Sequence, residues 1–374
     1  MRPDIIIETL LHAGFEAYYV GGCVRDTLLG RPVHDWDITT SARPEQVMAV
    51  FPRCIPTGVK HGTVTVLLDG CTAEVTTYRV DGEYEDARRP EHVEFVRSLR
   101  EDLARRDFTV NAMAMDRSGR ITDLFDGRDD LHARVIRCVG DPDRRFSEDA
   151  LRMLRAIRFS AQLGFSVASE TMEALRRQRS LCARLSCERV QTEAEKTLLS
   201  PEPERFGEMM SLGLLTACGL SGEADVSLLR HVPARRDTRW AAAKLCAQEL
   251  DPVRFRLPAA LCRQIETCAR TWQTDRSELD WKRLIAAEGW DAARLQAAMQ
   301  GSPAVDRIAD SGECVSLAQL AVTGRDFPEL QGPCVGSMLH VLLDHVLTHP
   351  EDNSRERLLT LAQTINLEKG TNNS

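Results

Sequence analysis

The sequence predicts an α+β fold in which a mixed β-sheet with helices comes first and an all-helical region follows. Up to about residue 130, short segments rich in β-branched and aromatic residues alternate with helical segments, separated by glycine and proline. From Ser147 onward, apolar residues recur about every 3.6 positions and strand signals disappear. With 374 residues, 43% of them hydrophobic, the chain is long enough for two or more domains.

The elements follow from this pattern in order. The expected strands are AYYVGG (17–22), DWDITT (35–40), GTVTVLLDG (62–70), CTAEVTTYRV (71–80) and RITDLFDG (120–127). The expected helices of the first part are VRDTLLG (24–30), PEQVMAVF (44–51) and EDLARRDFTVNAMAM (101–115). The helical part includes SEDALRMLRAIRFSAQLG (147–164) and RVQTEAEKTLL (189–199), and breaks are expected at GDPDRRF, LLSPEPERF and MQGSPAVD.

Composition narrows the class of protein. No stretch approaches the ~20 apolar residues of a membrane span, and the start of the chain is too short and too acidic for a signal peptide, so we expect a cytoplasmic protein with no membrane partner. The 12 cysteines lack a CxxC pair, which favours reduced thiols over disulfides or zinc. A net charge of −8 argues against a wholly basic nucleic-acid coat but does not exclude RNA as a partner.

The stretch YYVGGCVRD places a glycine turn between a strand and a helix. Gly21 and Gly22 let the backbone approach a ligand that a Cβ atom would block. The following helix start offers unpaired N–H groups and Arg25 adds further donors, so a triphosphate is an expected ligand. On its own, such a turn is more often only a turn.

Two carboxylates strengthen this interpretation. Asp35 and Asp37 are two positions apart, so on a strand they project to the same face. Adjacent carboxylates repel unless a cation lies between them, and Mg²⁺ prefers a few carboxylates plus phosphate oxygens. Glu74, in a threonine-rich strand, is either a third acidic group of this site or a solvent-facing residue beside Thr72 and Thr76.

Four motifs in a fixed order resemble a known family. GGCVRDTLLGRPVHDWDITT (21–40) resembles the signature of class II tRNA nucleotidyltransferases and bacterial poly(A) polymerases, of the DNA polymerase β-like nucleotidyltransferase superfamily. RRDFTVNAMA (105–114) is similar to the ribose-binding motif of that family, EDALRMLRAIRF (148–159) to its base-selecting motif and TYRVDGEYEDARRPEHVEF (77–95) to its flexible loop. Residues 188–215 resemble its neck and early body, and residues 322–347 resemble its tail, whereas 220–310 carry little resemblance.

The resemblance implies an architecture of four parts. These are a nucleotidyltransferase head at 1–140, a helical neck for base selection at 141–204, a helical body at 205–300 and a tRNA-binding tail at 301–374, arranged as an elongated chain of helices after the head. The resemblance also implies that Asp107 binds the ribose, with Arg106 and Asn111 near the nucleotide. The alternative for the Arg105–Arg106–Asp107 cluster is a cap ahead of a helix TVNAMAM.

The base-selecting motif has a chemical rationale. On a helix, Asp149, Arg152 and Arg155 lie three apart and share a face. An aspartate accepts from an amino group and an arginine donates to a ring nitrogen, a pattern that suits both cytosine and adenine and mismatches uracil and guanine. The alternative is an ordinary helix with an exposed Glu148–Arg152 ion pair.

The function implied is addition of CCA to the 3′ end of tRNA from CTP and ATP with release of pyrophosphate. Asp35 and Asp37 would hold Mg²⁺, with Glu74 as a further catalytic residue. The resemblance implies that a full-length loop favours the complete reaction over CC- or A-addition or poly(A) synthesis, and this sequence departs from many relatives in having Ala87 where they have glycine. A small-molecule nucleotidyltransferase and a non-catalytic RNA-binding protein are the rivals, and the sequence leaves open whether the chain forms a homodimer.

Overall fold

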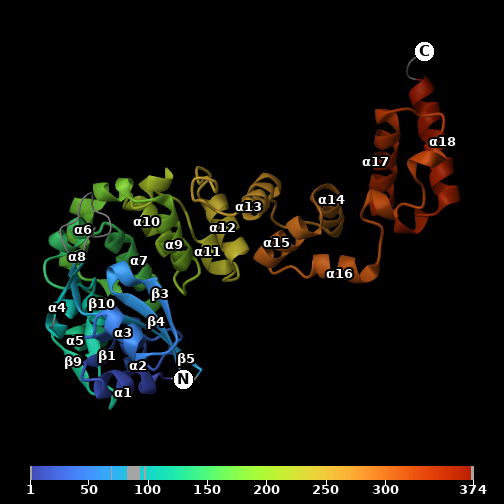
Figure 1. Cartoon of the computed structure of the whole chain (residues 1–374). Helices are drawn as coiled ribbons and strands as arrows, with labels where there is room; N and C mark the ends of the chain where they lie inside the picture. The colour runs from blue at the N-terminus through green and yellow to red at the C-terminus, as the bar shows by residue number, and fades with distance from the viewer. Residues whose placement is uncertain (1, 69, 82–92, 97, 372–374) are drawn as a thin grey trace. The chain divides into compact units, whose positions relative to one another are not determined.

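The computed structural model of the chain describes residues 2–68, 70–81, 93–96 and 98–371. It contains two compact units, one of Met1–Ala224 with Arg254–Arg256 and one of Asp225–Val253 with Leu257–Ser374. Figure 1 labels most of their helices and some of their strands. The finer division into head, neck, body and tail remains a prediction.

A seven-stranded mixed sheet forms the centre of the first half of the first unit. Its strand order is β3-β4-β5-β2-β1-β8-β9. β2 and β5 are parallel and the other neighbours are antiparallel. The strands are β1 (Ala17–Val20), β2 (Asp37–Thr40), β3 (Cys54–Gly58), β4 (Thr63–Leu68), β5 (Cys71–Thr77), β8 (Met113–Met115) and β9 (Ile121–Asp123). The predicted mixed sheet is therefore confirmed, and the pair β2–β5 carries the acidic residues discussed below.

Helices accompany this sheet and then replace it along the chain. Those in the first part are α1 (Asp4–His12), α2 (Gly22–Leu28), α3 (Pro44–Val50), α4 (Leu99–Ala104) and α5 (Gly127–Ala133). Next come α6 (Pro142–Glu148), α7 (Leu151–Leu163), α8 (Ser169–Gln178), α9 (Cys187–Leu198) and α10 (Arg205–Ser211), with short 3₁₀ turns that include η2 (Thr109–Asn111) and η4 (Thr216–Cys218). In α7, Met153, Leu154 and Ile157 are fully buried, as expected for the apolar face of a packed helix.

Two sequence expectations need correction. The helix predicted over 101–115 ends at Ala104, and the chain then forms η2 and strand β8. All of Met113, Ala114 and Met115 are buried, and a continuous buried run does not distinguish a strand from a helix by its periodicity. The region after Ser147 also contains one short strand, β11 (Ser166–Val167), which pairs in parallel with β10 (Val135–Ile136).

A second small sheet lies beside the predicted loop. β6 (Arg79–Asp81) pairs with β7 (Val93–Phe95) in antiparallel fashion. Most of the loop between them, including Ala87, falls outside the described residues, so the expectations for that segment are untested.

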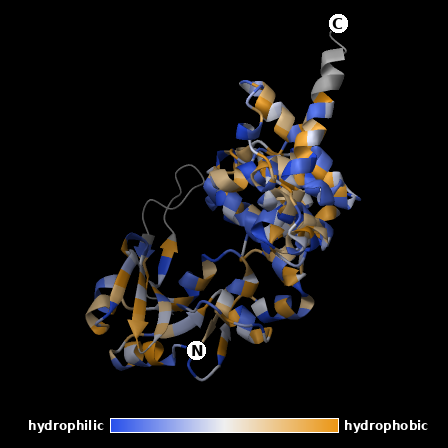
Figure 2. Ribbon diagram, turned by 90° about the vertical axis from the view of Figure 1, so that its right-hand side faces the viewer, coloured by the Kyte–Doolittle hydropathy of each residue, from blue (hydrophilic) through white to orange (hydrophobic). Residues whose placement is uncertain are grey.

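The second unit is helical throughout its described part. Its helices are α11 (Leu228–His231), α12 (Arg236–Cys246), α13 (Ala259–Thr271), α14 (Glu278–Glu288), α15 (Trp290–Gln300), α16 (Ala304–Ser311), α17 (Pro333–Thr348) and α18 (Arg355–Thr371). Trp281, Leu342 and Val346 belong to one apolar core that joins α14, α16 and α17. Hydrophobic and hydrophilic residues alternate around the helices in Figure 2, which fits one-sided burial. None of the helices in the described ranges is both long and apolar enough to span a lipid bilayer.

Candidate active site

Gly21 lies at the point where β1 turns into α2. Its φ is +75°, a conformation that favours glycine, and it is the N-cap residue of α2. A Cβ atom at this position would lie 3.2 Å from Nη1 of Arg106 and 3.5 Å from Oδ2 of Asp37. The turn therefore leaves a space between a guanidinium and a carboxylate. Gly22 faces the guanidinium of Arg25 in a similar way, because a Cβ atom on Gly22 would lie 3.5 Å from Nη2 of Arg25.

Three acidic residues meet near this turn. Asp37 and Glu74 are register partners on the parallel strands β2 and β5, and Asp35 precedes β2 by two residues. Burial raises the pKa of Asp37 to about 6, the charge of Arg106 opposes this shift, and repulsion by Glu74 and Asp35 adds to it. Glu74 is exposed to solvent and lies beside Asp37 on the neighbouring strand, so it is both solvent-facing and close to the other two carboxylates.

These carboxylates fit a hard divalent cation bound together with a substrate. Within the described ranges, no three His, Cys, Asp or Glu side chains are grouped closely enough to hold a metal ion by themselves. Mg²⁺ does not require such a cage, because it commonly uses one or two carboxylates and takes its other ligands from water and substrate phosphates. Asp37, which lies beside the space at Gly21, and Asp35, whose charge acts on Asp37, provide oxygen donors of this kind.

A chain of hydrogen bonds connects the glycine turn to the ribose motif. Nη1 of the buried Arg25 donates to Oδ1 of Asn111 at 2.7 Å, and Nδ2 of Asn111 donates to Oδ1 of Asp107 at 3.3 Å. Nε of Arg155 donates to Oδ2 of Asp107 at 2.7 Å. Burial alone would raise the pKa of Asp107, but the charge and hydrogen bonds of Arg155 dominate and lower it to about 2.

The base-selecting residues are held differently from the prediction. Asp149 does not lie on the helix with Arg152 and Arg155 but just before α7, where its Oδ1 accepts from the backbone N–H of Leu151 at 3.0 Å. Its Oδ2 accepts from Nη2 of Arg189, on α9, at 2.8 Å. The structure still brings Asp149, Arg152 and Arg155 to one pocket.

The predicted alternative for Arg152 is present as well, but it is not a solvated surface pair. Nη1 of Arg152 lies 2.8 Å from Oε2 of Glu148, and the two side chains are only 9% and 14% exposed. Nη2 of Arg152 donates to the carbonyl of Arg105 at 3.0 Å. This ion pair therefore fixes Arg152 at the wall of the pocket.

The pocket has a volume of about 340 Å³ and a strongly positive lining. Leu151, two aspartates and six arginines border it. The aspartates are Asp107 and Asp149, and the arginines are Arg79, Arg105, Arg106, Arg152, Arg155 and Arg189. Excess arginine suits an anionic ligand such as a nucleotide. Arg106 belongs to this pocket and also faces Gly21 and Asp37, so it links the pocket to the acidic residues.

Sequence reasoning did not single out Arg79 or Arg189, and it considered Arg105 only as part of a capping cluster. Arg189 lies 40 positions from its partner Asp149, and no local spacing signals such a contact. An arginine near the start of an amphipathic helix normally reads as a solvated residue.

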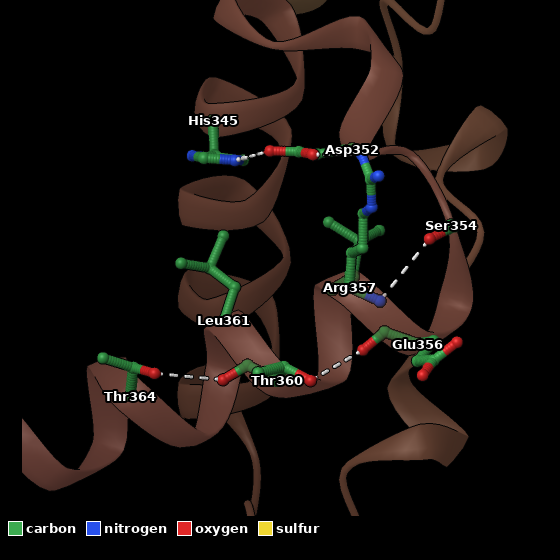
Figure 3. A pocket seen from close by; sticks show the side chains of 9 residues that line it. His345, Asp352, Ser354, Glu356, Arg357, Thr360, Leu361 and Thr364 are labelled. Carbon is green, nitrogen blue, oxygen red and sulfur yellow. Dashed lines mark hydrogen bonds and ion pairs between the residues drawn. The ribbon is translucent and has the colours of Figure 1, made fainter.

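Another cavity, of about 520 Å³, lies in the second unit between α17 and α18. Figure 3 shows its side chains, with Asp352 between His345 and Arg357. Oδ2 of Asp352 lies 2.8 Å from Nε2 of His345, and Oδ1 accepts from Nη1 of Arg357 at 2.7 Å. These groups compensate one another and serve to connect the two helices.

Comparison with known protein families gives two matches. Residues 17–137 match the poly A polymerase head domain, and residues 164–218 match a probable RNA and SrmB-binding site of polymerase A. A CCA-adding enzyme of Anoxybacillus flavithermus is 40% identical over 373 residues, 94% of each chain. That of Geobacillus sp. strain WCH70 is 40% identical over 399 residues, which cover 98% of this chain and 97% of the relative.

Two solved structures of CCA-adding enzymes share the fold of this chain. The CCA-adding enzyme of Bacillus stearothermophilus in complex with CTP is 35% identical and superposes with a TM-score of 0.81 over 100% of both chains. The Thermotoga maritima CCA-adding enzyme complexed with tRNA, at 19% identity and a TM-score of 0.67, shares the fold over 97% of this chain and 96% of its own.

Proposed function

This chain belongs to the family of CCA-adding enzymes, and we propose that the turn at Gly21, the acidic residues and the arginine-lined pocket form its nucleotide site. The enzyme adds CCA to the 3′ end of tRNA without a nucleic-acid template, using CTP and ATP and releasing pyrophosphate. One observation carries the assignment of the site. Arg106 faces Gly21 and Asp37 and also borders the pocket of Asp149 and Arg152, so triphosphate and base would bind to one continuous surface.

The triphosphate binds at the glycine turn in this proposal. Gly21 and Gly22 leave room for phosphate oxygens, and Arg25 and Arg106 supply positive charge. Asp35 and Asp37 hold Mg²⁺, with Glu74 beside them. When bound, the ion supplies charge neutralisation for the phosphates and acidifies the attacking 3′-hydroxyl.

The ribose and the base are read by the neighbouring residues. Asp107 accepts from a ribose hydroxyl, and its low pKa keeps it an acceptor at neutral pH. Asp149 accepts from the exocyclic amino group of cytosine or adenine, while Arg152 donates to the ring nitrogen. Uracil and guanine would leave these groups mispaired, at about 1–3 kcal/mol for each unmade hydrogen bond.

The remaining helices serve the tRNA in this proposal. Residues 301–374 bind the tRNA by its shape and phosphates, because A-form RNA offers side chains little sequence to read. We also propose that the enzyme is cytoplasmic and that two copies of the chain associate as a homodimer.

The test is an extension assay with Mg²⁺, a tRNA that lacks its 3′ CCA, and each nucleotide alone or in mixtures. Products are sized at single-nucleotide resolution. We expect growth by C, C and A, refusal of UTP and GTP, and no product from Asp35→Ala. A long ladder of A from ATP alone would instead identify poly(A) synthesis.

A further inference from the structure

Asp102, on α4, is a fully buried carboxylate outside the motifs that bind nucleotide. Its Oδ1 accepts from Nε and Nη2 of Arg105 at 3.1 and 2.7 Å. Its Oδ2 accepts from Nη2 of Arg106 at 3.2 Å and from the hydroxyl of Thr39 at 3.1 Å. One charge without solvent contact thus joins two adjacent arginines to strand β2.

Each partner of Asp102 leads to a different part of the nucleotide site. Arg106 faces Gly21 and Asp37. The carbonyl of Arg105 accepts from Nη2 of Arg152. Thr39 is two residues after Asp37 on β2, so the two side chains project to the same face of the sheet.

Fold stability alone does not explain a charge in this position. Burial disfavours ionised Asp102, yet the guanidiniums of Arg106 and Arg105 hold its pKa below the ordinary value, so it stays a carboxylate. Buried ion pairs seldom stabilise a fold more than apolar residues of similar size. The hydrogen bonds of Asp102 instead orient the guanidinium groups of Arg105 and Arg106.

On the basis of the proposed function, we infer that Asp102 is a positioning residue for the nucleotide. It holds Arg106 toward the triphosphate and away from a direct ion pair with Asp37, and through Arg105 it supports the backbone that orients Arg152. Without the charge of Asp102, Arg106 would pair with Asp37, where it competes with the cation for the same carboxylate.

The test measures CTP binding by calorimetry in the absence of tRNA, so that no turnover occurs. Asp102→Asn keeps the size of the side chain and removes its charge. Glu101→Gln is the matched control, because Glu101 is the adjacent acidic residue and is exposed. We expect the Kd for CTP to rise by about tenfold or more in D102N and to stay unchanged in E101Q.

Extension kinetics separate positioning from misfolding. A positioning role raises KM for CTP and for ATP in D102N while kcat at saturating nucleotide is largely kept, whereas partial unfolding lowers kcat at constant KM. If D102N does not fold, Thr39→Val provides the test, since it removes the hydroxyl that donates to Asp102 at 3.1 Å and to the carbonyl of Thr76 at 3.3 Å. We expect T39V to weaken CTP binding by roughly threefold.

The outcomes distinguish this inference from the proposed function. A wild-type protein that does not bind CTP would refute the proposed site as a whole. If the wild type binds CTP and a folded D102N binds it with equal affinity, only the role of Asp102 is overturned. If D102N does not fold, a folded T39V with wild-type affinity for CTP leads to the same conclusion.

Discussion

Asp37 carries its negative charge at a place that disfavours it. Its pKa is raised to about 6, first by burial and further by the nearby charges of Glu74 and Asp35. Between about pH 4 and pH 6 the folded state therefore binds more protons at this residue than the unfolded state does. Below this pH window the Asp37 carboxyl is neutral and costs no folding stability. Above the window its charge lowers the free energy of unfolding by on the order of 2 kcal/mol.

Replacing this carboxylate should therefore stabilise the protein while it abolishes catalysis. We expect Asp37→Asn to raise the free energy of unfolding at pH 7–8 by about 2 kcal/mol, and this gain to vanish below about pH 4. Urea unfolding across pH, with a chelator present, measures it. Asp35→Asn is the comparison, because Asp35 is exposed and its removal should change stability by less than about 0.5 kcal/mol. Equal stability of D37N and wild type at pH 8 would argue against a strained carboxylate.

Arg189 is expected to set the accuracy of base selection through Asp149. Its Nη2 donates to Oδ2 of Asp149, which fixes the carboxylate that reads the base. We predict that Arg189→Gln lowers the preference for CTP over UTP, measured as a ratio of kcat/KM, by about tenfold. Lys196→Gln is the control, because Lys196 is an exposed residue of the same helix α9. An unchanged ratio in R189Q would mean that Asp149 is oriented without Arg189.

At the scale of elements, the β1–α2 turn depends on a glycine for two separate reasons. Gly21 has a positive φ, and its missing Cβ leaves the space beside Arg106 and Asp37. Gly30, just after α2, also has a positive φ, of +65°, but no atom lies within 4 Å of its ideal Cβ. Alanine at Gly30 would therefore introduce backbone strain alone, whereas alanine at Gly21 would introduce backbone strain and also fill the space at the site.

We predict that Gly21→Ala and Gly30→Ala each lose about 1–2 kcal/mol of stability, because alanine is strained at positive φ. Only G21A should also lose CTP binding, by tenfold or more, since its methyl group occupies the space proposed for the phosphates. Thermal unfolding and calorimetric titration of both variants measure the two effects. Normal CTP affinity in G21A would move the triphosphate away from this turn.

Local patterns predicted the elements that carry the site better than the contacts between them. The glycine turn, β2 and β5 follow from the local pattern of β-branched residues and glycine. The expected strand over 35–40 begins only at Asp37, so Asp35 lies before β2 and acts on Asp37 through its nearby charge. β8 was predicted as helix, because Met113–Met115 is buried on both faces and lacks the alternation of a half-exposed strand. The contacts of Asp149 with Arg189 and of Asp102 with Thr39 span 40 and 63 positions, and only the tertiary fold creates them.

At the scale of the whole molecule, the residues proposed for nucleotide binding all belong to the first unit, whereas the second unit has an apolar core of its own. Leu342 of α17 is fully buried in that core, while its neighbour Val341 is 42% exposed. Removing buried methyl groups from Leu342 leaves a cavity, which typically costs 2–5 kcal/mol. The same truncation at Val341 should cost less than about 0.5 kcal/mol.

This difference allows nucleotide binding and tRNA use to be separated. We expect Leu342→Ala to lower the unfolding temperature of the second unit and to raise KM for tRNA, and to leave the Kd for CTP unchanged. Val341→Ala should resemble wild type in all three measurements, which calorimetry and extension assays provide. The reason is that residues 301–374 are proposed to bind tRNA, and a loosened core displaces the side chains that make those contacts. If L342A weakened CTP binding as much as it weakened tRNA use, the nucleotide site would depend on the second unit, and the assignment of separate tasks to the two units would be wrong.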